Sequence, residues 1–138
     1  MNILVIGCGR IGSSLAEELD KRGHDVSVID QNPEKLEMLS ADFSGFTTIG
    51  IPIDLDVLKR AGITTCDVLY AVTDNDDINI MVSQIAHKTF KIGKIFARVA
   101  DIRKGEVFEK LGINVLCPTR LTVNAACEAI PENASDDK

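Results

Sequence analysis

The residues near the amino terminus that could do chemistry form a glycine-rich loop, "GCGRIG" at residues 7–12. This G-x-G-x-x-G spacing follows an apolar run and opens a helical segment, which is the context of a phosphate-binding loop. We expect Gly7 to allow the tight turn, Gly9 to leave room for a pyrophosphate, and Gly12 to let helix and strand pack closely. The helix N-terminus would offer N–H groups and partial positive charge to phosphates. The alternative is that the glycines serve only the turn.

An acid, Asp30, closes the second apolar run, 18 residues beyond Gly12. Its carboxylate can accept hydrogen bonds from the hydroxyls of an adenosine ribose. A 2′-phosphate there would meet a like charge, at a cost of roughly 4 kcal/mol for a separation of ~4 Å and an effective dielectric constant near ~20. The sequence therefore favours NAD(H) or a plain adenine nucleotide over NADP. The alternative role for Asp30 is a helix or turn cap.

Three further places could contact a ligand. Arg10 would either pair its guanidinium with terminal phosphates or be a solvated residue of the first helical turn. The run "TDNDD" at residues 73–77 follows a later strand, at the end where ligands bind in parallel sheets. Helix capping is its favoured role and a divalent-metal site the minor one. Arg98 would contact the ligand, hold Asp101 or serve an interface.

These residues need a scaffold, and the sequence predicts alternating strands and helices. Apolar runs typical of strands buried on both faces occur at residues 3–6, 26–29, 46–49, 68–72, 95–99 and 115–117. Helices are expected at residues 13–22, 33–41, 55–61, 76–89 and 104–111. This alternation predicts an α/β fold, a Rossmann-like doubly wound six-stranded parallel sheet in a single domain.

The segment after Pro118 is expected to form one more helix. Its apolar residues would form a stripe made of Leu121, Ala125, Ala126, Ala129 and Ile130. Such a stripe either covers the edge of the sheet or makes a dimer or domain contact. We therefore divide the chain into a nucleotide-binding domain (residues 1–118), a crossover or dimerisation helix (119–131) and a polar tail (132–138) that is expected to be disordered.

Composition narrows the classes of function. The net charge of −6, from 21 acidic and 15 basic residues, disfavours a nucleic-acid partner. Without a signal-peptide pattern or an apolar run of membrane-spanning length, we expect a cytoplasmic protein with no direct membrane insertion. The tyrosine of the chain, Tyr70, is followed four residues later by Asp74 and not by the lysine of a short-chain dehydrogenase. We find no catalytic candidate and expect no enzyme.

The order of the motifs resembles the N-terminal lobe of the regulator of potassium conductance family, also called RCK, KTN or the TrkA N-terminal domain. The resemblance covers about residues 1–130 and rests on "GCGRIGSSLAEEL", "VSVIDQNPEKLEML", "LKRAGITTCDVLYAVTDNDDINIMVSQIAHK" and "IFARVADIRKGEVFEKLGINVLCP". The succession of "AGI", "AVT", "ARV" and "LGINV" is more specific than the glycine loop.

The resemblance implies which residues bind the cofactor. The loop glycines would hold phosphates, Asp30 the ribose, and Arg10 phosphates within or across a dimer, while Thr73 and Arg98 would line the site. The expected set is Gly7, Cys8, Gly9, Arg10, Ile11, Gly12, Asp30, Gln31, Gly50, Ile51, Val72, Thr73, Asp74 and Arg98. No catalytic residue and no metal ligand is expected.

The resemblance also implies a function. The chain would be a regulatory subunit or domain that binds NAD(H), with ATP or ADP as the alternative, and gates a potassium channel or transporter. It would be peripheral to the membrane through that partner and would assemble as a dimer or a ring, with the helix after Pro118 joining neighbouring subunits. The alternative from another class is an NAD-dependent oxidoreductase, or the cofactor-binding domain of one.

The sequence departs from the family pattern in two ways. The residues "GIPI" at 50–53 replace the usual Gly-Asp-Ala-Thr, near the place where adenine would sit. The usual C-terminal lobe of the family does not follow the crossover helix in this sequence.

Overall fold

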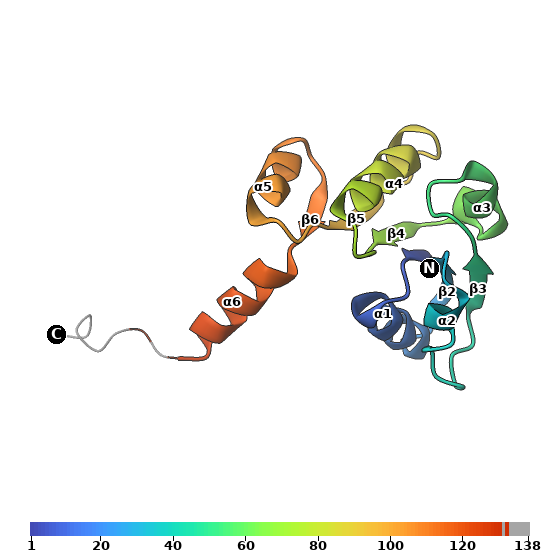
Figure 1. The fold of residues 1–138 in the computed structure, drawn as a ribbon, viewed down its shortest axis with the longest axis horizontal. Coiled ribbons are helices and arrows are strands. Elements are labelled where there is room, and N and C mark those ends of the chain that lie inside the picture. The colour runs from blue at the N-terminus through green and yellow to red at the C-terminus, as the bar shows by residue number, and fades with distance from the viewer. Residues whose placement is uncertain (131, 133–138) are drawn as a thin grey trace.

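The computed structural model describes residues 1–130 and 132 of the chain. Its centre is a six-stranded sheet in the order β3-β2-β1-β4-β5-β6, in which each strand is parallel to its neighbours (Figure 1). The strands are β1 (Asn2–Ile6), β2 (Asp25–Asp30), β3 (Phe46–Ile49), β4 (Val68–Ala71), β5 (Lys94–Arg98) and β6 (Asn114–Leu116). This is the doubly wound order of a Rossmann fold, so the predicted fold class is confirmed.

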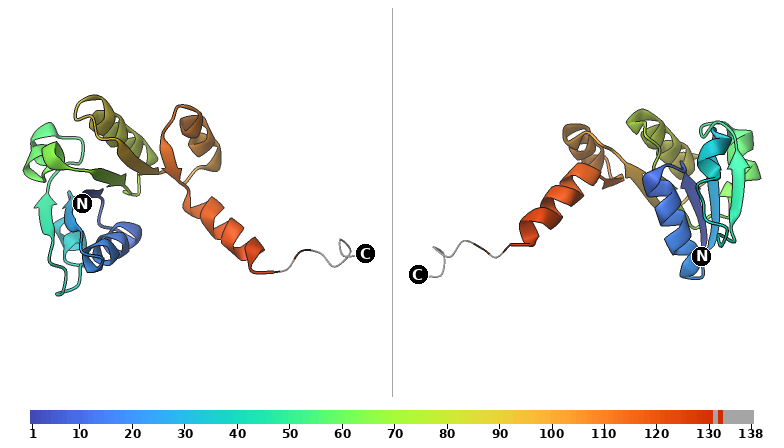
Figure 2. Two further views of the ribbon diagram at one scale, coloured as in Figure 1. Left: turned by 180° about the vertical axis from the view of Figure 1, so that it is seen from behind. Right: turned by 60° about the horizontal axis from the view of Figure 1, so that its bottom comes forward.

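Helices connect the strands and cover both faces of the sheet (Figure 2). They are α1 (Arg10–Lys21), α2 (Pro33–Leu36), α3 (Leu55–Arg60), a 3₁₀ turn η1 (Ile63–Thr65), α4 (Asp76–Lys88), α5 (Ile102–Lys110) and α6 (Pro118–Glu128). On one face Leu4 belongs to a core that includes Leu58 of α3 and Val82 of α4. On the other face Val5 shares a core with Ala16 of α1. Burial on both faces explains why the sequence of β1 is a continuous apolar run.

Among the helices predicted between strands, two boundaries are wrong by three residues or more, and the others lie within two residues of the structure. Helix α1 begins at Arg10, three residues earlier than expected, so the second half of the glycine loop is already helical. Helix α2 covers only Pro33–Leu36 and does not extend to residue 41. The chain turns after this single helical turn, because the Ser40 N–H donates to a carboxylate oxygen of Glu17 on α1, at 2.6 Å. This contact fixes the backbone of residue 40 away from a continued helix.

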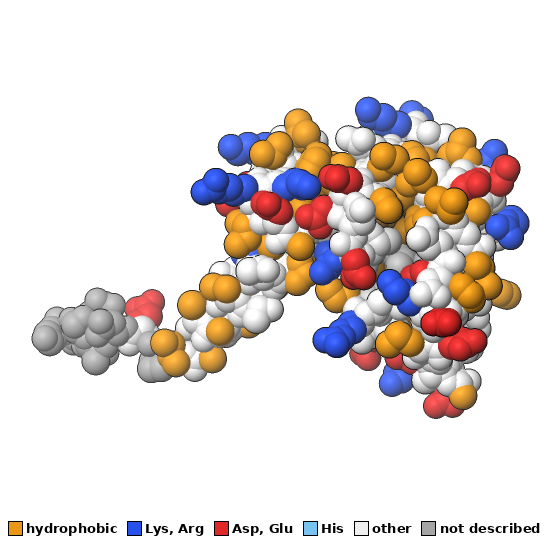
Figure 3. Space-filling model, viewed as in Figure 1, with side chains coloured by type: hydrophobic (Ala, Val, Ile, Leu, Met, Phe, Trp, Pro, Cys, Tyr) orange, Lys and Arg blue, Asp and Glu red, His pale blue; other side chains and the backbone are white. Residues whose placement is uncertain are grey.

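The last helix, α6, stands apart from the sheet (Figures 1 and 2). None of its residues is buried. An ion pair of 2.8 Å between Arg120 and Glu109 ties it to α5. The alternative that its apolar stripe covers the sheet edge is therefore wrong, and Figure 3 shows hydrophobic side chains along its surface. Apart from residue 132, the predicted polar tail lies outside the described residues, as does residue 131.

Among the described residues, no helix has both the length and the apolar character that crossing a bilayer requires.

Candidate functional site

Two of the loop glycines are required by the fold itself. Gly7 follows β1 with a φ of +100°, which side chains rarely adopt. A Cβ added to Gly12 would lie 1.8 Å from the carbonyl oxygen of Gly7, so it would push α1 away from the end of β1. These two glycines set the strand–turn–helix geometry, and the fold needs them whether or not a ligand binds.

Gly9 differs from both, because no atom of the described protein requires a glycine at this position. Its φ of −78° suits any residue. A Cβ added to it would meet Asp74 Oδ1 at 3.9 Å, which is an ordinary van der Waals contact, and no other atom within 4 Å. Open space beside a backbone without a side chain is what the close approach of a ligand needs.

The N-terminus of α1 is also left open. Helix α1 has no side-chain cap and no acid in its first turn. Side chains cap the other helices that follow strands β2 to β5, namely Asn32, Asp54, Asn75 and Asp101. The first N–H groups of a helix need partners from outside the helix, and an anion can supply them. The open helix end and the open space at Gly9 therefore suit the same phosphate group.

Asp30 holds the glycine loop in place. Its side chain is only 7% exposed. One carboxylate oxygen accepts from the Cys8 N–H and the other from the Asn32 N–H, each at 2.8 Å. A carboxylate oxygen has two lone pairs, so both oxygens can still accept a hydroxyl of a ribose. Asp30 thus joins β2 to the loop after β1 and remains available to a ligand.

The Cys8 side chain belongs to the core behind the loop. It is fully buried among residues of β1, β2 and α1. Burial, then the nearby charges of Asp30 and Glu17, raise the pKa of the thiol from 9.0 to about 11. The backbone of Cys8 serves the site through Asp30, while its thiol stays protonated at neutral pH.

A cavity of about 240 Å³ opens beside the glycine loop, at the carboxyl ends of β1, β2 and β4. It is lined by Gly7, Gly9, Asp30, Gln31, Lys35, Pro52, Val72, Thr73, Asp74, Asn75 and Ile78. A second cavity of about 410 Å³ adjoins it and is lined by Gly9, Arg10, Ile11, Lys35, Met38, Val72, Asp74 and Arg98. We refer to the two together as the cleft. Parallel sheets bind their ligands at this edge.

The cleft brings together ten of the fourteen residues expected from the sequence; Cys8, Gly12, Gly50 and Ile51 do not line it. The first two support the loop from behind. A Cβ on Gly50 would lie 2.6 Å from a methyl group of Val57, so this glycine serves packing against α3. Ile51 is exposed, and the next residue, Pro52, lines the cavity in its place.

Asn79, which the sequence analysis did not single out, organises the far side of the cleft. Its fully buried amide accepts from the Thr73 hydroxyl at 2.6 Å and from the Thr73 N–H at 2.9 Å. It donates to the carbonyl oxygens of Thr73 and Arg98, at 3.0 and 2.9 Å. Asn79 therefore ties the end of β4 to the end of β5. Its spacing from Val82 and Ala86, on the buried stripe of α4, was a signal that could have found it.

Cations and one carboxylate lie across the mouth of the cleft. Lys35 Nζ is 3.5 Å from Asp74 Oδ2, and Arg98 Nη1 is 3.8 Å from Asp74 Oδ1. The same Nη1 donates to the carbonyl oxygen of Thr73 at 2.9 Å, while the buried Nε of Arg98 has no partner among the described residues. Lys35 was missed by sequence reasoning, because nothing in its spacing from Asp30 marks it as a cleft residue.

The strand order, the glycine loop after β1 and the acid at the end of β2 together define a Rossmann-type α/β domain. Within that class, the chain belongs to the TrkA-N domain family, whose family model matches residues 3–118. The family predicted from the sequence is thereby confirmed.

Individual relatives agree with this family. The Trk system potassium uptake protein TrkA of Streptomyces coelicolor is 38% identical over 124 residues, which are 90% of this chain and 56% of that protein. The chain thus spans about half the length of this relative. Among solved structures, the Kef C-terminal domain of Shewanella denitrificans in its AMP-bound form is 26% identical with a TM-score of 0.78, over 94% of this chain and 79% of that one. The GsuK channel bound to NAD shares the fold at 23% identity and a TM-score of 0.73, over 87% of this chain and 22% of that one.

Proposed function

We propose that the chain is a nucleotide-sensing regulatory domain that binds NAD(H) or an adenine nucleotide and acts on a membrane potassium channel or transporter. The observation that carries the nucleotide part is the open space at Gly9, next to a helix N-terminus without a cap. The AMP in the related Kef domain supports an adenylate ligand, since AMP, ADP, ATP and NAD all contain this unit.

In this proposal each part of the ligand has a place in the cleft. The phosphates lie over Gly9, at the N-terminus of α1, and extend toward Arg10 and Arg98. The adenosine ribose donates to the free lone pairs of Asp30. The base lies beside Pro52, in the cavity that also contains Asp30. NADP is disfavoured because its 2′-phosphate would approach the Asp30 carboxylate.

In this proposal the ligand regulates by binding and is not chemically converted. Its binding shifts an assembly of chains between two states, and α6 supplies a contact to a second copy, as the apolar stripe on this exposed helix supports. A coupling of ~1–3 kcal/mol per site is typical of allosteric proteins. Several sites together then reach the ~5.5 kcal/mol that moves a two-state gate from about 1% to about 99% open. The domain sits at the inner membrane surface through its transport partner.

The nucleotide part is tested with Gly9→Ala. We expect NAD, NADH, ATP, ADP or AMP to stabilise the wild-type protein by ~2.7 kcal/mol at one hundred times Kd, which raises its thermal midpoint, and NADP to leave the midpoint unchanged. Gly9→Ala should fold normally and lose this response, because the methyl group fills the space of the phosphates. Gly93→Ala is the matched control, since it adds the same methyl in open space at a remote glycine. Equal nucleotide responses in both variants would contradict the proposal.

The transport part needs a measurement in cells. We expect cells that carry only the Gly9→Ala protein to take up potassium at a rate that no longer follows the NADH or ATP level. Gly93→Ala cells should behave as wild type. Unchanged potassium uptake after deletion of the whole gene would show that the transport assignment is wrong, while leaving nucleotide binding in place.

A further inference from the structure

Asp74 lies at the mouth of the cleft, between two cations. It lies in the loop between β4 and α4, and its side chain is 80% exposed. Its two carboxylate oxygens face two different cations, Lys35 Nζ at 3.5 Å and Arg98 Nη1 at 3.8 Å. Both distances exceed that of a close charge-assisted hydrogen bond. The carboxylate therefore bridges two elements, α2 and β5, through contacts that solvent can loosen.

The same carboxylate lies beside the space that the phosphates need. Asp74 Oδ1 is the atom nearest to a Cβ placed on Gly9, at 3.9 Å. Asp74 also lines both cavities of the cleft, as Gly9 and Lys35 do. An anion at the uncapped N-terminus of α1 would therefore meet the negative charge of Asp74 and the two cations that Asp74 now holds.

A carboxylate and a phosphate compete for the same partners. Both are anions whose oxygens accept hydrogen bonds from ammonium and guanidinium groups. Two negative charges this close repel each other. A phosphate and the Asp74 carboxylate therefore cannot both bind strongly between Lys35 and Arg98. Arg98 is only 20% exposed, but the Asp74 carboxylate is 80% exposed and lies 3.5 and 3.8 Å from its two cations. Such long contacts from an exposed carboxylate are weak, so a ligand phosphate can displace it.

We infer that Asp74 is an internal competitor for the phosphates of the nucleotide. In the empty cleft it holds Lys35 and Arg98 together; on binding, the phosphates replace it at these cations and the carboxylate turns to solvent. Asp74 thereby lowers the affinity for phosphorylated ligands and not for the nucleoside part. This inference rests on the proposed nucleotide function and adds a residue that sets how tightly the site holds its ligand.

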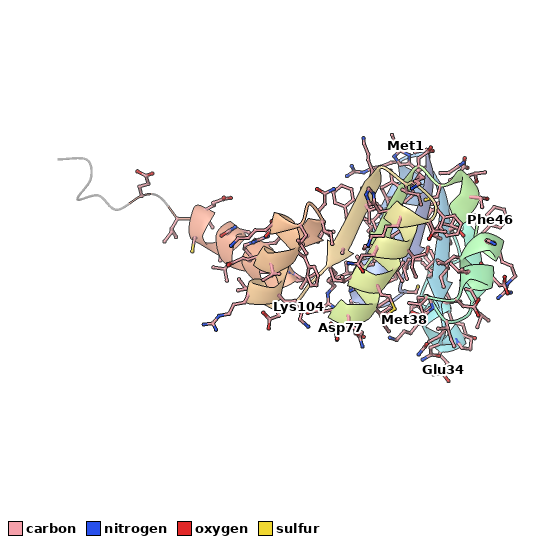
Figure 4. All side chains as sticks on the ribbon, turned by 90° about the horizontal axis from the view of Figure 1, so that it is seen from above. Met1, Glu34, Met38, Phe46, Asp77 and Lys104 are labelled. Carbon is pink, nitrogen blue, oxygen red and sulfur yellow. The ribbon has the colours of Figure 1, made fainter. Side chains whose placement is uncertain are left out.

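The experiment compares Asp74→Asn with Asp77→Asn. Asparagine keeps the size of the side chain and removes its charge. Asp77 is a matched control: it lies on the first turn of α4, is 79% exposed, and pairs with Lys104 at 3.3 Å (both labelled in Figure 4). Neither Asp77 nor Lys104 lines a cavity of the cleft. Both variants change the net charge equally, so a difference between them reports the local contact. The ligands are ADP and adenosine, measured by calorimetry with EDTA present and at two salt concentrations.

We expect Asp74→Asn to bind ADP about tenfold more tightly than wild type, with a smaller gain at high salt because salt screens the repulsion. Adenosine affinity should stay unchanged in both variants, and Asp77→Asn should bind ADP as wild type does. A gain of the same size in Asp77→Asn would mean that only the overall charge matters, and would overturn the inference.

The remaining outcomes separate the inference from the function on which it rests. Unchanged or weaker ADP binding in Asp74→Asn, with normal binding by wild type, would overturn the inference alone. If Asp74→Asn binds ADP more weakly than wild type only when magnesium replaces EDTA, Asp74 holds a cation for the phosphates. This result would also overturn the inference alone. Failure of the wild-type protein to bind any adenine nucleotide would overturn the proposed function and the inference together.

Discussion

The cleft and α6 differ in how their side chains are satisfied: those of the cleft make contacts within the chain, and those of α6 are exposed. In the cleft, the side chains of Asp30 and Asn79 are buried and hydrogen-bonded to the backbone of the same chain. In α6 no residue is buried, and Leu121 and Val123 of this helix are each more than half exposed, as is Ile130 just beyond its end. The described residues are therefore enough to shape the cleft, whereas α6 has an apolar surface that none of them covers.

This contrast separates the stability of the fold from the association of chains. Changes behind the glycine loop should alter the stability of the fold, because the groups there are packed against each other. Changes on α6 should alter how chains associate and leave the fold of one chain intact. Three predictions test the contrast, and they run from the largest expected effect to the smallest.

The largest effect is expected from Gly12→Ala. The new Cβ would lie 1.8 Å from the Gly7 carbonyl oxygen, so α1 must move away from β1 or the turn must open. We expect the free energy of unfolding to fall by about 3 kcal/mol, the upper range for overpacking. Urea unfolding followed by circular dichroism measures it. Gly9→Ala, with open space at its Cβ, should remain within about 0.5 kcal/mol of wild type. Equal stability of the two variants would show that the close approach of helix and strand is not required.

The middle effect concerns α6 and uses two neighbouring residues. Ala125→Asp places a charge on the apolar stripe, and Asn124→Asp places the same charge on the adjacent, polar position. If the stripe contacts a second copy, Ala125→Asp should weaken self-association by about tenfold, or 1.4 kcal/mol, in sedimentation equilibrium. Asn124→Asp should associate as wild type does. Both should unfold within about 0.5 kcal/mol of wild type, since neither position is buried.

Two outcomes would count against this view of α6. If both variants weaken association equally, the added charge acts on the whole chain and the stripe has no special role. If Ala125→Asp lowers the stability of the isolated chain by several kcal/mol, α6 packs on its own domain in solution, and the contrast with the cleft disappears.

Much of the fold followed from local sequence because its signals repeat along the chain. The apolar run of β1 is buried on both faces, as its lack of alternation indicated. The end of α2 was missed because the sequence 34–41 has helical propensity, and the contact that turns the chain comes from Glu17 on another helix. The direction of α6 was not predictable either, since an apolar stripe does not say which surface covers it.

The candidate site divides in the same way. Gly7, Gly9 and Asp30 were found because a motif fixes their spacing along the chain. Lys35 was missed because its position in the cleft depends on an ion pair with a residue 39 positions later, which no local pattern records. The motif predicted a separate role for each of its three glycines. In the structure Gly7 serves the turn and Gly12 the close packing of helix on strand, as predicted, and open space lies beside Gly9.

The smallest effect at neutral pH is expected from the thiol behind the glycine loop, whose contribution changes only in alkaline solution. Burial and neighbouring carboxylates raise the pKa of Cys8 to about 11 in the folded protein, against an ordinary value of 9.0. Folding therefore favours the protonated thiol, so its stabilising contribution is complete below pH 9 and is lost as the pH rises toward 11. We expect the urea midpoint of wild type to fall more steeply between pH 9 and 11 than that of Cys8→Ala.

Cys127, the exposed thiol of α6, is the control for Cys8. Comparing the two thiols tests the difference between the buried groups of the cleft and the exposed surface of α6. Cys127 lies where no side chain is buried, so Cys127→Ala should follow the wild-type pH profile, and iodoacetamide at pH 8 should label Cys127 while sparing Cys8. Parallel pH profiles for wild type and Cys8→Ala, or rapid labelling of Cys8, would mean that solvent reaches the inside of the loop. In that case a bound ligand or a second chain would be needed to exclude solvent from the cleft. The cleft would then need a partner, as the apolar surface of α6 does.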